Sequence, residues 1–396
     1  MTFYRTTRLM LSSAAILSFA SSAFALDGVD LLKKINAAYA IQGVSLASDG
    51  IDVDGSTVTL KGASFKPISA AGPGTQLGNV TMTGVDEEAG GYKVDKVAFP
   101  DLSATKEGVT VNATDMSISG LTIPADATAS GLDGMLLYQK AHAGPIHIVK
   151  DGLEVFSLEG IDANLTERGD KSGFDFDSSI KAIKADLSKV DDPASQDTIN
   201  KLALQHVNGN VTMKGSWALQ PGTIDIKDFA IDLDNIGRLD LAFGISGYTL
   251  DFMKSLQDTM KASQANPNKA EAQQATGLAM LGLMQQLTLN SAEITFKDAS
   301  ITKRALDYAG ASQGVSGVQM ANTLKGLTPI MLAQLNIPEL QAAVSAAVSS
   351  YLDDPKSFTV TAAPAKPVPF PMIVGAAMGA PNTIPSVIGL KVSANN

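Results

Sequence analysis

Ser312 lies in the segment that most closely resembles a catalytic motif. Residues 310–314 (GASQG) have the G-x-S-x-G pattern of the α/β-hydrolase nucleophile elbow. That elbow needs a strand before it and a helix after it, and its triad needs a histidine later in the chain. Residues 302–309 have a helical pattern instead, and all three histidines precede Ser312. We therefore interpret 310–314 as a glycine-rich turn between helices and expect Ser312→Ala to leave any function intact.

The three histidines could in principle ligate a metal ion together with a carboxylate. His142 and His147 are close in sequence, whereas His206 is distant. Their separation is not the i, i+4 spacing of a helical ligand pair, and Gly144-Pro145 lies between them. We expect two histidines in loops or at strand edges rather than a metal site.

A possible calcium loop is suggested by three aspartates, Asp49, Asp52 and Asp54, that precede Gly55. An EF-hand loop needs a glutamate at its twelfth position, but the window that begins at Gly50 ends on a lysine. We interpret the aspartates as the solvated face of a strand that ends in an Asp-Gly turn.

The remaining side chains indicate no further chemistry. The chain has no cysteine, which excludes thiol catalysis, thiolate metal sites and disulfides. It contains neither a P-loop nor an HExxH motif, and no pair of carboxylates is singled out by its spacing. The single tryptophan, Trp217, is expected to be a packing residue. The sequence therefore predicts no catalytic, cofactor-binding or metal-ligating residue, no cofactor, and a protein that is not an enzyme.

Residues 1–25 have the features of a cleavable secretion signal. Arg5 and Arg8 precede a largely apolar segment, residues 9–20, which is short for a membrane span, and residues 23–25 (AFA) offer a small-x-small cleavage site. The alternative is an uncleaved N-terminal anchor. Cleavage would leave Leu26 as the first residue and deliver the protein to the periplasm.

The charge balance limits the possible partners. The chain has 30 basic and 40 acidic residues, a formal charge of −10. An acidic protein is a poor ligand for nucleic acid and for anionic lipid headgroups. We therefore expect no nucleic-acid partner.

Residues 26–247 are predicted to form a β-rich region. Segments such as 58–61 (VTLK), 109–112 (VTVN), 174–177 (FDFD) and 224–227 (IDIK) alternate apolar and polar residues. Asp-Gly and Asn-Gly pairs punctuate them, as is typical of hairpin turns. Such strands form antiparallel sheets with one wet face.

An internal repeat lies within this region. Residues 78–84 (GNVTMTG) recur as 209–215 (GNVTMKG), an offset of 131. At the same offset, Gly91 matches Gly222 and Lys96 matches Lys227, and Asp101-Leu102 matches Asp232-Leu233. We interpret the repeat as a duplicated β unit.

Residues 248–396 are predicted to be rich in helices and to return to the sheet. Apolar residues at helical spacing predict helices in 250–260 and from Pro338 onward. An Ala-, Gln-, Leu- and Met-rich composition predicts a helix in 270–287. Helices are also expected in 301–309 and 315–326, with a strand at 287–298. Two more helices are expected in the β-rich region, at 131–142 and 192–204, the second with Pro193 in its first turn.

The C-terminal tail contains alternating prolines, from Pro364 to Pro371, which favour an extended segment or an edge strand. No charged residue occurs between Lys366 and Lys391, so a membrane span has to be considered. The many prolines and glycines there favour a buried, docked tail instead. We expect no stable membrane span once the signal has been removed.

Parts of the chain resemble a group of exported proteins. Residues 321–370 and 390–395 look like the C-terminal region of uncharacterised exported proteins of Gram-negative bacteria, and so does 229–247 (FAIDLDNIGRLDLAFGISG). More loosely, the chain is similar to the AsmA- and YdgA-like β-rich envelope proteins. The resemblance implies a long curved antiparallel sheet with helices packed on it, and in the AsmA-like proteins such a sheet is an apolar trough that handles lipid.

These observations predict an α+β fold. We expect a long curved antiparallel sheet, built from a duplicated β unit, with helices packed on it mostly in the C-terminal half. The leading functional hypothesis is a non-enzymatic periplasmic protein that supports cell-envelope integrity, with a lipid or other hydrophobic ligand and an envelope protein as its candidate partners. The alternatives are a structural or protein-interaction module without a ligand and, third, a periplasmic hydrolase.

Overall fold

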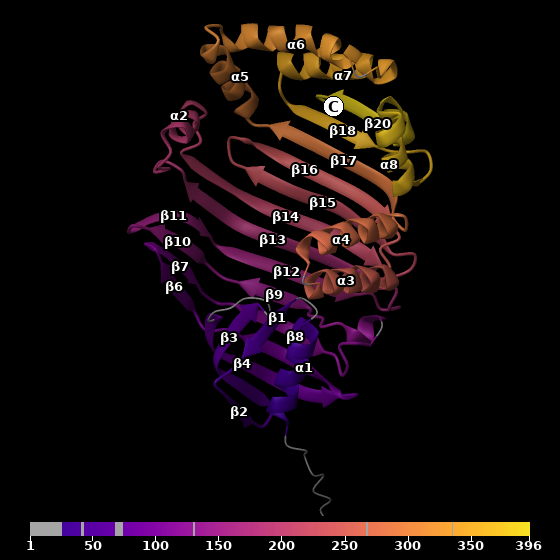
Figure 1. Cartoon of the computed structure of the whole chain (residues 1–396). Helices are drawn as coiled ribbons and strands as arrows, with labels where there is room; N and C mark the ends of the chain where they lie inside the picture. The colour runs from indigo at the N-terminus through magenta and orange to yellow at the C-terminus, as the bar shows by residue number, and fades with distance from the viewer. Residues whose placement is uncertain (1–25, 41–42, 68–73, 130, 267, 335) are drawn as a thin grey trace, which may run out of the picture.

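The fold is built around one long, curved antiparallel β-sheet (Figure 1). The computed structural model describes residues 26–396 except 41–42, 68–73, 130, 267 and 335, so the predicted signal lies outside the described residues. Within the described part of the chain, twenty strands belong to this sheet and all their pairings are antiparallel. The predicted α+β fold is confirmed.

The N-terminal half of the chain is mostly strands. In order, it contains α1 (Gly28–Ala40), β1 (Val44–Ala47), β2 (Gly50–Asp54), β3 (Thr57–Pro67), β4 (Thr75–Glu88), β5 (Gly91–Ala98), β6 (Leu102–Lys106), β7 (Val109–Ala113), β8 (Ser117–Ile123), the 3-10 helix η1 (Gly131–Gly134), β9 (Lys140–Ala143), β10 (Ile146–Lys150), β11 (Leu153–Leu158), β12 (Gly160–Glu167) and β13 (Gly173–Asp186).

Helices become frequent in the C-terminal half. This half contains α2 (Pro193–Lys201), β14 (His206–Ala218), β15 (Thr223–Leu233), β16 (Gly237–Ser246), α3 (Leu250–Ala265), α4 (Lys269–Met284), β17 (Thr288–Asp298), α5 (Ile301–Ser312), α6 (Gly317–Gln334), α7 (Pro338–Asp353), β18 (Ser357–Ala362), β19 (Val368–Pro369), α8 (Phe370–Gly379), η2 (Pro381–Thr383), α9 (Ile384–Val387) and β20 (Leu390–Ala394).

The strand order follows from the pairings. From the N-terminal end, the main sheet runs β3–β4–β5–β8–β9–β12–β13–β14–β15–β16–β17–β18–β20, and β1 and β2 both pair with the outer edge of β3. At β13 the sheet forks. The strands β11 and β12 share one edge of β13, and β11 continues into a side arm made of β10, β7 and β6.

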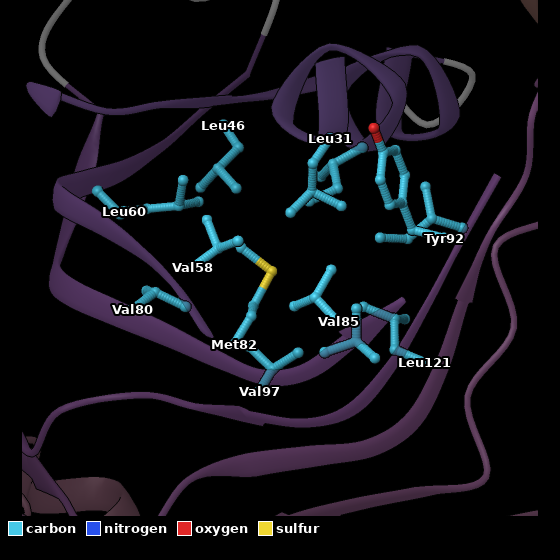
Figure 2. Packing of buried hydrophobic residues seen from close by; sticks show 14 residues of the cluster. Leu31, Leu46, Val58, Leu60, Val80, Met82, Val85, Tyr92, Val97 and Leu121 are labelled. Atoms are coloured by element: carbon cyan, nitrogen blue, oxygen red, sulfur yellow. The ribbon is translucent and has the colours of Figure 1, made fainter. Parts of the chain in front are cut away.

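The best-packed core lies at the N-terminal end, where α1 covers one face of the sheet (Figure 2). Leu31 of α1 is fully buried against strand residues such as Val58 and Met82. Tyr92 is also buried, and its Oη donates to Asp30 Oδ2 at 2.9 Å. Burial, together with this hydrogen bond, raises the pKa of Tyr92. Helix α1 is thus held by packing, by this contact and by two hydrogen bonds between the Asn36 side chain and the Leu46 backbone.

The two copies of the internal repeat form equivalent hairpins. The first copy forms β4 and β5, and the second forms β14 and β15. Met82 and its counterpart Met213 lie on the same face of the sheet, in one continuous cross-strand row. The repeat therefore places matching apolar residues on the same face at two distant points.

The predicted helix at 131–142 is wrong. Only the 3-10 turn η1 forms there, and residues 140–143 are the strand β9. Gly131 has φ +81°, and a Cβ on Gly134 would lie 2.2 Å from the Ala129 carbonyl oxygen, so the glycines fit a tight turn. The following segment gains more from pairing, because β9 fills the gap between β8 and β12.

The other predicted helices are present. Asp192 caps α2, with Oδ2 accepting from the Ser195 amide at 2.7 Å, and Pro193 is in the first turn as expected. Helix α6 extends further than predicted, past the internal Pro329. In the tail, Val368 and Pro369 form only the short strand β19, and the helix α8 follows where an extended segment was expected. Its prolines stand at the start of the helix, where they cost no backbone hydrogen bond.

Candidate functional site

Three adjacent rows of apolar side chains cross one face of the sheet from β12 to β18. We call these three rows the apolar face. The middle row consists of Ala163, Ser178, Met213, Phe229, Leu241, Ile294 and Val360. One flanking row consists of Ile161, Ile180, Val211, Ile231, Leu239, Phe296 and Phe358, and the other of Leu165, Phe176, Gly215, Ile226, Phe243, Ala292 and Ala362.

The opposite face of the same strands is polar. A neighbouring cross-strand row there contains Asp162, Ser179, Thr212, Asp240, Thr295 and Thr359. The two faces differ because successive residues of a strand point to opposite sides. Bulges in β15 and β17 add single residues without breaking the separation between the faces.

The apolar face is open to solvent at β16 and β17. Phe243 and Ile294, on the neighbouring strands β16 and β17, are 40 % and 49 % exposed. Most of the other residues in the three rows are half-buried. With strands about 4.8 Å apart and residues about 3.4 Å apart along them, the apolar face extends about 30 Å by about 14 Å. A contiguous apolar surface with large exposed side chains is a candidate binding surface.

Helices border the apolar face at both ends of its strands (Figure 1). At one end, Trp217 stacks on Phe174, and Tyr248 links Trp217 to the buried Phe252 of α3. The Trp217 indole Nε1 also donates to the Tyr248 carbonyl at 2.9 Å. This aromatic cluster fixes α3, and with it α4, beside the apolar face.

The other border is formed by α2 and α5. The Arg304 guanidinium of α5 donates to the carbonyls of Leu202 and Ala203, just after α2, at 3.0 and 3.2 Å. Thr198 and Tyr308 join the two helices through a hydroxyl contact of 3.3 Å. At the C-terminal end, Tyr351 of α7 packs edge-on against Phe358. The helices thus border the apolar face and leave Phe243 and Ile294 exposed.

An apolar hollow adjoins the apolar face at the fork of the sheet. Its volume is about 310 Å³, and its lining includes Phe99, Met116 and Ile118 together with Ile161 and Ala163 of the apolar face. The middle row continues through it, because Ala163 pairs with Ala141 and Ala141 with Ile118. The apolar surface therefore extends from the apolar face toward the N-terminal core.

Asp162 is the most strongly perturbed carboxyl of the polar face. Lys181 donates to its Oδ2 at 2.9 Å, and His142 Nδ1 lies 2.8 Å from its Oδ1. These two hydrogen bonds lower the pKa of Asp162 to about 2. The Asp162 carboxylate therefore ties together β9, β12 and β13 on the face opposite the apolar one.

A second charge cluster surrounds Arg238 on the polar face. Its guanidinium lies 2.7 Å from Asp240, 3.4 Å from Asp232 and 3.6 Å from Asp228. Lys297 also approaches Asp240, at 3.0 Å. The arginine occupies the centre of the aspartates, so we assign the cluster to strand pairing.

The structure does not assemble a triad around Ser312. Its Oγ donates to the Ala309 carbonyl at 2.8 Å at the end of α5, and α6 begins at Gly317. Residues 310–314 therefore form the predicted end of one helix and the turn to the next.

The histidines and the N-terminal aspartates also lie apart from one another. His142 pairs with Asp162, His147 Nδ1 lies 2.7 Å from Glu154, and His206 is 3.7 Å from Asp186. Asp52 pairs with Lys61 across a hairpin. Within the described ranges, no group of three or more histidine or acidic side chains is arranged to hold a metal ion.

Comparison with known proteins adds a partial match. A family model described as an uncharacterized protein matches residues 230–395. No curated protein matched the sequence. The matched segment begins near the middle of β15 and contains Phe243 and Ile294, together with all helices from α3 onward.

Sequence reasoning missed the residues that matter most in this site. Phe243 and Ile294 look like ordinary members of amphipathic strands. Only the placement of the covering helices distinguishes them, since the same pattern leads to burial elsewhere in the sheet. In the described chain, no helix is both long and apolar enough to cross a membrane.

Proposed function

We propose that this protein is a non-enzymatic periplasmic component of the bacterial cell envelope that binds lipid acyl chains on its apolar face. The observation that carries the proposal is the exposure of Phe243 on β16 and Ile294 on β17 within a continuous apolar surface. A module without a ligand would be expected to close this surface with its own helices.

The size of the apolar face fits an acyl chain. A lipid monolayer contributes about half of the roughly 30 Å hydrocarbon thickness of a bilayer, so one extended chain needs about 15 Å. The apolar face, about 30 Å long, accommodates that length. Burial of each methylene contributes about 0.8 kcal/mol, so even part of a chain gives useful affinity.

The composition of the apolar face favours an acyl chain over a protein partner. Protein interfaces carry about one hydrogen bond per 100–200 Å². Among the residues of the three rows, Ser178 supplies the one side-chain hydroxyl, and none is charged. A partner that makes no hydrogen bonds suits this surface, as a hydrocarbon chain does. The resemblance to AsmA-like proteins is consistent with the same ligand class.

The proposal is tested by titrating delipidated protein with a fluorescent fatty acid. Phe243→Asp and Ile294→Asp each place a carboxylate in the apolar face, and we expect each to weaken binding at least tenfold, about 1.4 kcal/mol. Val53→Asp is the matched control, because Val53 is exposed to the same degree as Phe243 but lies on β2, far from the apolar face. Failure of the wild-type protein to bind the probe, or equal binding by all variants, would refute the proposal.

A further inference from the structure

Helix α6 forms the outer layer at the C-terminal end of the molecule (Figure 1). It packs on α5 and α7, and α7 in turn packs on β18 and β20. Gly317, Met320 and Ala321 face inward and are buried. The rest of the helix lies at the periphery, at the end of the sheet farthest from α1.

The outward side of α6 is apolar. Leu327, Ile330 and Met331 are 45 %, 60 % and 65 % exposed. Their i, i+3, i+4 spacing places them next to one another on one face of the helix. Leu324, one turn earlier, extends the same stripe and is also exposed. Exposure of this kind is costly in water unless something covers it.

The stripe is uncharged in an acidic protein. Helix α6 contains no acidic residue, and its one cation, Lys325, is half-buried and paired with Asp353 of α7. The chain as a whole carries a formal charge of −10. A surface without charge is suited to a zwitterionic partner and gives binding that depends little on salt.

The dimensions of α6 favour a lipid surface over a second copy of the chain. An 18-residue helix is about 27 Å long and about 10 Å wide, so its footprint is about 270 Å². A stable protein interface buries about 800 Å² on each partner. A bilayer needs no such complementary area, because apolar side chains of a surface helix enter the boundary between headgroups and acyl chains.

We propose that α6 docks the protein on a zwitterionic lipid bilayer surface through Leu327, Ile330 and Met331. The helix lies in the plane of the surface and does not span it. Docking places the C-terminal end of the sheet nearest the lipid surface. This inference goes beyond the proposed function, and the two can fail separately.

The test is co-sedimentation of the protein, purified from a host that exports it, with vesicles of phosphatidylcholine and phosphatidylethanolamine. We expect the wild-type protein to bind equally at low and high salt, and Ile330→Asp to lower its partition coefficient at least tenfold. Ile330→Ser, which keeps the helix neutral, should lower it less. Val29→Asp is the control, because Val29 is 70 % exposed on α1 at the opposite end and accepts an acidic residue in the first helical turn.

Two outcomes would overturn the docking proposal. One is wild-type protein that does not bind the vesicles, or binds them no better than Ile330→Asp. The other is a wild-type dimer in light scattering that Ile330→Asp converts to a monomer, which would assign the stripe to a second copy. The fatty-acid titration separates the two proposals: Ile330→Asp should keep wild-type affinity for the probe, and Phe243→Asp should keep wild-type binding to vesicles.

Discussion

Asp162 illustrates how single residues link the strands through the polar face. Its carboxylate accepts hydrogen bonds from Lys181 and His142, which come from the two strands that flank β12. Such contacts link strands without contributing any atom to the apolar face. These polar contacts therefore stabilise the strands from the side opposite the apolar face.

The lowered pKa of Asp162 predicts a pH-dependent contribution to stability. The carboxylate form is favoured in the folded protein, so this contribution is complete above the usual pKa of 3.8 and is lost as the pH falls toward 2. Asp162→Asn should lower the free energy of unfolding by about 1–2 kcal/mol at neutral pH, after allowance for solvent screening. Denaturant unfolding as a function of pH measures both quantities.

A second aspartate on the same face serves as the control for Asp162. Asp175 pairs with Arg168 at 2.8 Å, but its side chain is exposed. Asp175→Asn should therefore lower the free energy of unfolding less than Asp162→Asn does. If the stability gap between wild-type protein and Asp162→Asn stays constant from neutral pH down to pH 2, the assigned role of Asp162 is wrong.

The roles of some single residues could be predicted from the sequence, because the order of residues along the chain excluded a catalytic role. Ser312 could be dismissed because no histidine follows it, and the structure places it at the end of a helix. Trp217 was expected to pack, and it stacks on Phe174. Phe243 and Ile294 could not be singled out, because their exposure depends on helices that lie elsewhere in the sequence.

At the scale of elements, α3 depends on one aromatic anchor. Phe252 is buried against Tyr248, which contacts Trp217 on the sheet. Helix α3 in turn packs against α4, so both helices should respond when the anchor is lost. The aromatic cluster is thus the main anchor of α3 on the sheet.

Phe252→Ala should loosen the packing of α3 and α4 on the sheet. Removing a buried phenylalanine side chain costs about 3–5 kcal/mol, and here the loss should be concentrated in α3 and α4. Amide hydrogen exchange should show faster exchange in both helices and little change in β3 to β5. Met260→Ala, at an exposed position of the same helix, should change exchange little. Uniform loss of protection across the whole sheet would contradict the local anchor.

Helical periodicity predicted elements well where the apolar stripe was long. The helices α3 and α7 follow from spacing, α4 follows from its composition, and Pro193 in the first turn supports α2. The helix predicted at 131–142 does not form because the apolar residues of this segment are few and adjacent. Its glycines permit a turn, and its last residues pair with the sheet as β9. Strand pairing over long distances outweighed a weak local preference.

At the scale of the whole molecule, the sheet acts as one amphipathic surface. Alternation within each strand was predictable, and so was the duplication that places Met82 and Met213 on the same face. The fork at β13 and the order of the N-terminal strands were not, because pairing partners come from distant parts of the chain. The open part of the apolar face at β16 and β17 results from helices that cover the ends and borders of the sheet.

Native mass spectrometry of the protein, taken directly from the periplasm without delipidation, tests the central claim most directly. The account predicts the mass of the chain plus a lipid that carries acyl chains and dissociates on unfolding. In the Phe243→Asp, Ile294→Asp double variant the lipid-bound fraction should fall about tenfold. A bare polypeptide mass from freshly isolated wild-type protein that also fails to take up added fatty acid would contradict the claim.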